Sequence, residues 1–234
     1  ATLLFSGRSS YSNWLLHKMP DVDLMNSTAS FYDLNGLFSI NLTSKDKVIV
    51  FGYYSNDKFG FNKNINYEYS NTLASFRWTH IFSNKLSSNL LTGFSMYKYN
   101  LHELDTMHRE NAYQVNLNTR YNNLKWNFNW LPNHKHSVDF GINSILYRIS
   151  PGEQSPYKAE SLIKPLKVQT EKALEMAAYM SDNFDLFPKL NAETGFRFVH
   201  YMALGPDSVQ TYIPGQPRSM ETVFDTLYYS NKQV

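Results

Sequence analysis

The sequence predicts an all-β chain, an antiparallel up-and-down meander that forms part of a large transmembrane β-barrel. Three observations predict this class. Long segments alternate apolar and polar residues with a period of two, as strands with two different faces do. Tight turns and long polar connections take turns along the chain. Helical periodicity is nearly absent from the 234 residues, and no apolar run reaches the ~18 residues of a membrane helix.

Period-two alternation first becomes clear in residues 30–43. One face of this segment carries apolar side chains, namely Tyr32, Leu34, Phe38, Ile40 and Leu42. The other face carries Asp33, Asn35, Ser39 and Asn41. The same pattern predicts strands in residues 67–82, 86–99, 136–149, 172–187 and 190–204. Residues 2–16 and 48–54 alternate less regularly, but we also expect strands there.

Residues 113–131 change phase partway along. Tyr113 to Tyr121 place apolar side chains at odd positions, whereas Leu124 to Trp130 place them at even positions. A β-bulge inserts one residue and would cause such a slip. The sequence therefore predicts a bulge at Asn122–Asn123.

The connections predict that the two ends of the sheet differ. Tight turns are expected at residues 44–47, 83–85, 132–135 and 188–189. Long polar connections are expected at 17–29, 55–66, 100–112, 150–168 and 205–222. Successive antiparallel strands exit at opposite ends, so all tight turns fall at one end and all long loops at the other, as in outer-membrane barrels.

The predicted strands are long for a soluble protein. Segments of ~13–16 residues reach ~45 Å, enough to cross an apolar band at a ~40° tilt, whereas ordinary soluble strands have ~5–6 residues. We expect residues 1–234 to be one segment of about nine to ten strands, ending within a strand, with the plug domain and the barrel closure outside it.

Composition and motifs exclude several function classes. A net charge of +2 is too small to favour nucleic acid as a partner. The chain has no cysteine, which excludes disulfides and thiolate metal sites. It contains no glycine-rich phosphate loop, no G-x-S-x-G elbow and no H-E-x-x-H motif. We therefore expect no catalytic residue, no cofactor and no metal site.

Candidate site residues follow from the two faces. Aromatic residues near the tight turns are candidates for a membrane girdle: Trp78, Phe82, Trp126, Trp130, Phe184 and Phe187. Charged residues on the polar face are candidates for the barrel lumen: Arg77, Lys125, Asp139, Glu175, Glu193 and Arg197. Tyrosines near the long loops are candidates for substrate contact: Tyr97, Tyr99, Tyr147 and Tyr201. The alternative reading is a sandwich, in which the aromatics would pack in the core and the charges would lie on the surface. Within a barrel, we expect the charges to make wall or plug contacts without a role in substrate binding.

Four blocks of the chain resemble a known family. They are FYDLNGLFSINLTSKDKVIVFGYYSNDKFGF (31–61), NTLASFRWTHIFSNKLSSNLLTGFSMYKY (71–99), LKWNFNWLPNHKHSVDFGIN (124–143) and EMAAYMSDNFDLFPKLNAETGFRFVHYMALGP (175–206). Together, and in this order, they resemble TonB-dependent outer-membrane receptors of the Bacteroidetes type.

The resemblance implies a barrel of the 22-stranded type in the cell outer membrane, closed by an N-terminal plug. It also implies active import of a scarce nutrient, driven through TonB with ExbB and ExbD. This chain would supply the central part of the barrel wall and some external loops, in contact with outer-membrane lipid. No site residue of the family transfers to this chain, because substrate contacts in the family vary with the loops and the plug.

Two alternatives remain open. The barrel could be a passive outer-membrane channel or a secretion or assembly component. The chain could instead be a soluble all-β carbohydrate-binding module, which would bury the apolar faces of its strands in a closed core.

Overall fold

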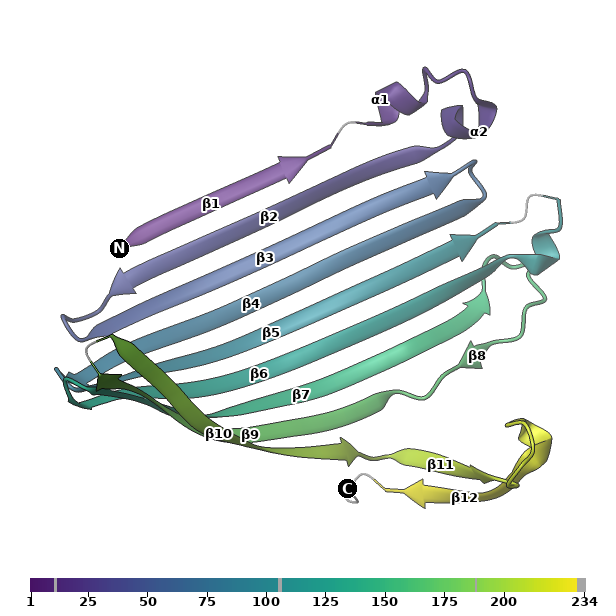
Figure 1. The fold of residues 1–234 in the computed structure, drawn as a ribbon. Coiled ribbons are helices and arrows are strands. Elements are labelled where there is room, and N and C mark those ends of the chain that lie inside the picture. Colours follow the sequence, from purple (N-terminus) through teal and green to yellow (C-terminus); the bar gives the residue numbers. More distant parts are fainter. Residues whose placement is uncertain (11, 105–106, 188, 231–234) are drawn as a thin grey trace.

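A computed structural model describes residues 1–10, 12–104, 107–187 and 189–230. Its main feature is one large antiparallel sheet (Figure 1). The strands of this sheet are β1 (Thr2–Ser9), β2 (Thr28–Asn41), β3 (Asp46–Phe61), β4 (Ile65–Ser83), β5 (Leu86–Glu103), β6 (Tyr113–Asn133), β7 (His136–Pro156), β8 (Leu166–Lys167), β9 (Glu171–Phe187) and β10 (Leu190–Leu204). The predicted all-β meander is confirmed.

Nine of these strands form a continuous path in chain order, from β1 at one edge to β10 at the other. The two-residue strand β8 pairs with β7 off this path, at Glu153 and Gln154. Every pairing is antiparallel, and the sheet does not close on itself. The described sheet is therefore an open segment of a barrel wall.

Short elements lie outside the sheet. A separate hairpin pairs β11 (Asp207–Tyr212) with β12 (Val223–Tyr229). The helical turns are α1 (Asn13–Leu16), α2 (Val22–Met25), η1 (Arg109–Asn111) and η2 (Met220–Thr222). Within the described ranges, no helix has the length and apolar character needed to cross a bilayer.

The two ends of the sheet differ, as the connections predict. At one end, residues 42–45, 84–85 and 134–135 make short links between consecutive strands. At the other end lie the longer connections, including residues 10–27 with α1 and α2, and residues 104–112 with η1 (Figure 1). We call these the turn end and the loop end.

The prediction of a long connection at residues 55–66 is wrong. Strand β3 continues to Phe61 and β4 begins at Ile65, so only residues 62–64 lie between them. The polar composition of this stretch suggested a loop, but cross-strand pairing satisfies its backbone groups as a hairpin. Strands β6 and β7 are likewise longer than predicted, with 21 residues each.

The predictions for residues 2–16 and for Asn122–Asn123 also need correction. Strand β1 ends at Ser9, and α1 begins at Asn13. In β6 the register is unbroken from Asn118 to Trp130, and its shift lies between Asn116 and Asn118. The apolar residues change phase at Asn122 because they change faces, while the backbone keeps its alternation.

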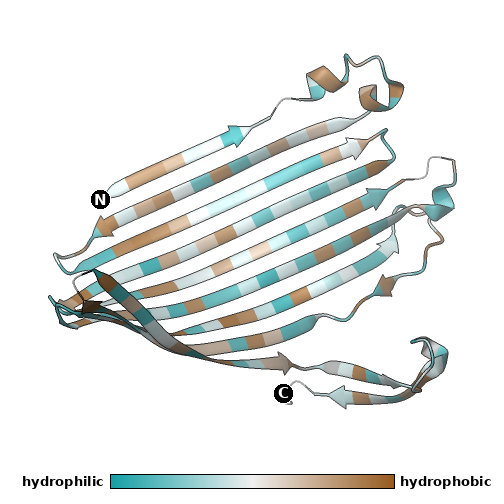
Figure 2. Ribbon diagram, in the orientation of Figure 1, coloured by the Kyte–Doolittle hydropathy of each residue, from teal (hydrophilic) through white to brown (hydrophobic). Residues whose placement is uncertain are grey.

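Register partners in an antiparallel pair share a face, so the register defines two faces across the whole sheet. The apolar face carries, in register order, Val50, Phe76, Thr92, Leu124, Ser144, Met176 and His200. The polar face carries, one step along, Ile49, Arg77, Leu91, Lys125, Asn143, Ala177 and Val199. Figure 2 shows hydrophobic and hydrophilic residues alternating along the strands.

Side chains on the apolar face are exposed rather than packed. Ile142 is 51% exposed and Phe198 is 68% exposed. Among the described residues, the buried hydrophobic side chains are only Ala112, Val138, Ala173 and Ala177. The accessible surface is 16200 Å² for 27.3 kDa, whereas a folded soluble monomer of that mass exposes roughly 11,000 Å². The sheet therefore has no closed hydrophobic core within its described part.

Candidate functional site

The polar face divides into two levels along the strands. Toward the turn end it carries charged and amide side chains, among them Arg77, Asn89 and Lys125. Toward the loop end it carries tyrosines, among them Tyr69 and Tyr99. This arrangement places a tyrosine-rich surface beneath the longer connections.

Two shallow hollows lie in the tyrosine-rich surface. The first, about 390 Å³, is lined by Leu73, Leu91, Tyr121, Ile145 and Tyr147, with neighbouring small residues of β4 and β5. The second, about 290 Å³, is lined by Tyr121, Tyr147, Ile149, Glu171, Lys172, Ala173, Tyr201 and Ala203. Tyr121 and Tyr147 line both hollows, so the two adjoin each other across β6 and β7.

Tyr147 is held in place from two sides. Its ring meets that of its register partner Tyr121 edge to face, with the ring centroids 5.3 Å apart. Its hydroxyl donates a hydrogen bond of 3.1 Å to Oε2 of Glu175. Aromatic pairs of this geometry add about 0.5–1.5 kcal/mol beyond buried area. The ring is therefore fixed with one side available to the hollow.

A second tyrosine cluster lies on β4 and β5. The Tyr99 ring is 5.1 Å from Tyr69 and 6.5 Å from Tyr67, centroid to centroid. At the start of β6, the Tyr113 hydroxyl donates to Oε2 of Glu103 at 2.6 Å. Tyr97 lies on the same face, as the register partner of Asn71 and Thr119.

The four tyrosines that the sequence predicted for substrate contact thus share the polar face near the loop end. The structure brings Tyr147 and Tyr201 to one hollow, whereas Tyr97 and Tyr99 belong to the neighbouring strand β5. Sequence reasoning did not select Tyr121, because the predicted bulge at Asn122–Asn123 placed it on the apolar face with Leu124, whereas the unbroken register places it on the polar face. The missing information was the register that sets Tyr121 opposite Tyr147.

By register, the six charged residues predicted for the lumen all lie on the polar face, at different levels along the strands. They are Arg77, Lys125, Asp139, Glu175, Glu193 and Arg197. Tyr179 of β9 organises two of them. Lys125 Nζ lies 5.7 Å and the Arg197 guanidinium 5.3 Å from its ring centroid. The Tyr179 hydroxyl also donates to Oδ1 of Asn127, across Gly141. The described wall therefore holds these cations by aromatic contact.

The aromatic residues predicted for the girdle lie toward the turn end. Trp78, Trp126, Trp130 and Phe184 are on the apolar face by register, and Phe82 lies 4.5 Å from the ring of His80, centroid to centroid. Phe187 falls on the opposite face by alternation. His80 Nδ1 lies 2.6 Å from Asp46 Oδ1, and His136 Nδ1 lies 2.7 Å from Asp182 Oδ2. These carboxylates partner two of the imidazoles on the apolar face.

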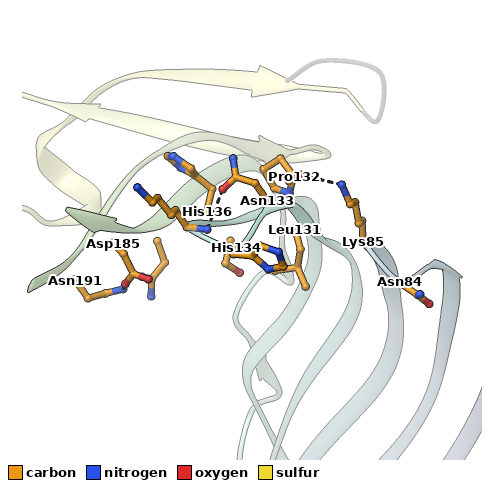
Figure 3. Close-up of a pocket in the computed structure, with 12 residues that line it drawn as sticks. Asn84, Lys85, Leu131, Pro132, Asn133, His134, His136, Asp185 and Asn191 are labelled. Atoms are coloured by element: carbon orange, nitrogen blue, oxygen red, sulfur yellow. Dashed lines mark hydrogen bonds between the residues drawn. The ribbon is translucent and has the colours of Figure 1, made fainter. Parts of the chain in front are cut away.

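A larger hollow of about 690 Å³ lies at the turn end, between the links that join β4 to β5 and β6 to β7 and residues Asn183, Asp185 and Asn191 of β9 and β10 (Figure 3). Lys85 Nζ donates to the Pro132 carbonyl oxygen at 3.2 Å, and Asn191 Nδ2 donates to Asp185 Oδ1 at 3.2 Å. Across the described residues, no three His, Cys, Asp or Glu side chains gather as metal ligands would. This hollow is a gap between polar turns, and Lys85, Asp185 and Asn191 are engaged in hydrogen bonds within it.

Comparison with known proteins supports the fold through structure alone. No family model matches the sequence, and no curated protein matches it. The copper transporter OprC matches with a TM-score of 0.61 at 7% identity, over 88% of this chain and 32% of OprC. The ferripyoverdine receptor of the outer membrane of Pseudomonas aeruginosa matches with a TM-score of 0.62 at 14% identity, over 98% of this chain and 34% of the receptor.

The chain spans about a third of the length of these solved structures. At such low identities the likeness establishes the fold. That fold is part of the wall of a large antiparallel β-barrel.

Proposed function

We propose that this chain forms part of the barrel wall of a TonB-dependent outer-membrane receptor that imports a scarce nutrient. One observation carries the proposal: a wide apolar face stays exposed on a sheet whose other face is polar and tyrosine-rich. Exposed apolar area of this size would cause aggregation in water but is the natural surface of a wall in lipid. The backbone pairing of the sheet meets the requirement that lipid-embedded backbone groups be satisfied internally.

The two levels of the polar face fit import. Tyrosines near the loop end, centred on Tyr121, Tyr147 and Tyr201, would meet cargo entering from outside. Charged residues near the turn end, such as Arg77 and Lys125, would solvate the lumen or contact a plug domain. TonB, with ExbB and ExbD, would supply energy through that plug. The Bacteroidetes type belongs to the proposal as well, on the strength of the four sequence blocks.

The rival function is a passive channel or an assembly barrel, which would use the same wall. A soluble carbohydrate-binding module is disfavoured because its strands would need a second sheet over the apolar face, and the described residues form one large sheet.

Energy dependence separates import from passive flow. The full-length receptor would be expressed in a strain lacking it, and growth would be measured on limiting iron chelates, copper, cobalamin or glycans. We expect growth to depend on both the receptor and an intact tonB gene. Growth that needs the receptor but survives loss of TonB would refute active import and favour the channel.

A further inference from the structure

Four basic side chains lie in a row on the apolar face, just beyond its apolar residues at the loop end. They are Lys98 on β5, Arg120 on β6, Arg148 on β7 and Lys172 on β9. Arg120 is the register partner of Arg148, and Arg148 is the register partner of Lys172. Lys98 pairs with Asn118, two residues along β6 from Arg120, so it lies on the same face one step nearer the loop end. We call these four residues the basic row.

The basic row lies on the boundary of the apolar band. Two residues nearer the turn end, about 7 Å along each strand, the same face carries Met96, Leu146 and Leu174. Leu146 is 41% exposed, and its register partner on β6 is Asn122. Toward the turn end the apolar band is interrupted at Ser144 and continues with Ile142. Beyond the basic row, the same face carries amides and hydroxyls such as Asn118 and Ser150. The row therefore lies where a bilayer's acyl region would give way to headgroups.

Like charges directly opposite each other on neighbouring strands are unfavourable unless an anion lies between them. Carboxylates do not supply that anion within the described part of the chain, where no ion pair involves the basic row. Glu153, on β7 beyond the row, is engaged by Lys167 at 2.9 Å. Arg120 Nε donates to the Asn118 side-chain oxygen at 3.2 Å, which leaves its charge uncompensated.

A hollow of about 300 Å³ adjoins the basic row on the same face. Its lining includes the cations Lys98 and Arg148, the ion pair of Lys167 with Glu153, and polar side chains suited to sugar hydroxyls, namely Asn100, Asn116, Asn118, Ser150 and Thr170. Strand β8 and the residues after it form one side of this hollow. Cations with amide and hydroxyl groups around them match a headgroup that carries both phosphate and sugar.

We propose that the basic row and this hollow bind the phosphorylated sugar headgroup of an outer-leaflet glycolipid, whose acyl chains lie along Met96, Leu146 and Leu174. The inference rests on the proposed membrane location of the barrel, but it does not depend on transport or on TonB. Charge complementarity and continuity with the apolar band select this occupant. Guanidinium groups bind phosphate oxygens in bidentate fashion, which suits Arg120 and Arg148.

The test uses the full-length receptor in nanodiscs that contain a phosphorylated glycolipid, its dephosphorylated form or phosphatidylglycerol. Retained lipid is counted by native mass spectrometry, and the lipid-dependent shift in Tm is measured in parallel. The variant replaces three cations, as Arg120→Gln, Arg148→Gln and Lys172→Gln. The matched control removes three cations at the turn end, as Lys45→Gln, Lys47→Gln and Lys135→Gln.

We expect the wild type and the control to retain the phosphorylated glycolipid in preference to both other lipids. We expect the basic-row variant to bind it roughly 100-fold more weakly, about fivefold for each cation near an anionic surface. Equal retention by the two variants, or equal retention of all three lipids by the wild type, would overturn the proposal. Loss of nutrient uptake with lipid retention intact would count only against the transport function.

Discussion

The substitution Ile142→Arg tests whether the apolar face of the sheet lies against lipid or against water. Ile142 lies within the apolar band, as the register partner of Trp126 and Ala178, and is 51% exposed. On a soluble protein, a substitution at so exposed a position changes stability by about 0.5 kcal/mol or less. On the lipid face of a barrel, an arginine near the bilayer midplane costs about 2–4 kcal/mol. The folding equilibrium should therefore fall by roughly 30- to 700-fold.

The neighbouring residue provides the control. Asn143 lies one position along β7 on the polar face, so Asn143→Arg places the same charge where water is expected. Both variants of the full-length receptor would be refolded into lipid vesicles across a urea series, and the folded fraction would be read from heat-dependent gel mobility. A cost below about 1 kcal/mol for Ile142→Arg, or equal costs for the two variants, would refute the lipid-facing assignment.

Three further predictions concern other parts of the wall. Tyr147→Ala should weaken cargo binding about fivefold or more in whole-cell binding assays without lowering the receptor level in the membrane, because it removes a fixed aromatic surface; unchanged binding would exclude this hollow. Gly141→Ala should destabilise the barrel by about 1–3 kcal/mol, since its Cβ would meet the Trp126 carbonyl oxygen, whereas Gly93→Ala has ordinary contacts at 3.8 Å and should be tolerated in the same refolding assay. The chain has no cysteine, so single spin labels at Phe198→Cys and Arg197→Cys can be compared directly. Oxygen should relax the label at position 198 more strongly, and a water-soluble nickel complex should relax the label at position 197 more strongly. The reverse result would show that the apolar face does not contact lipid.

The sequence alone determined the class of fold and the face of most strand residues. Alternation with a period of two is a local property, because each strand residue points opposite to its neighbours whatever the rest of the chain does. The separation of Phe196 and Phe198 from Arg197 could therefore be read without coordinates. The short links at 42–45, 84–85 and 134–135 could be read for the same reason, since their residues are close in sequence, whereas the link at 62–64 was missed.

Tertiary structure decided what depends on register and on strand pairing. The polar stretch at residues 55–66 became a hairpin because cross-strand hydrogen bonds extended β3 and β4. Near Asn122 the apolar side chains of β6 move from one face of the sheet to the other. Only the unbroken register of β6 with β7 distinguishes this from a bulge. The Tyr121–Tyr147 pair and the basic row join residues that are 22 or more positions apart in sequence. The spacing of such residues along the chain does not fix which of them meet, because pairing is set by how whole strands align across the sheet.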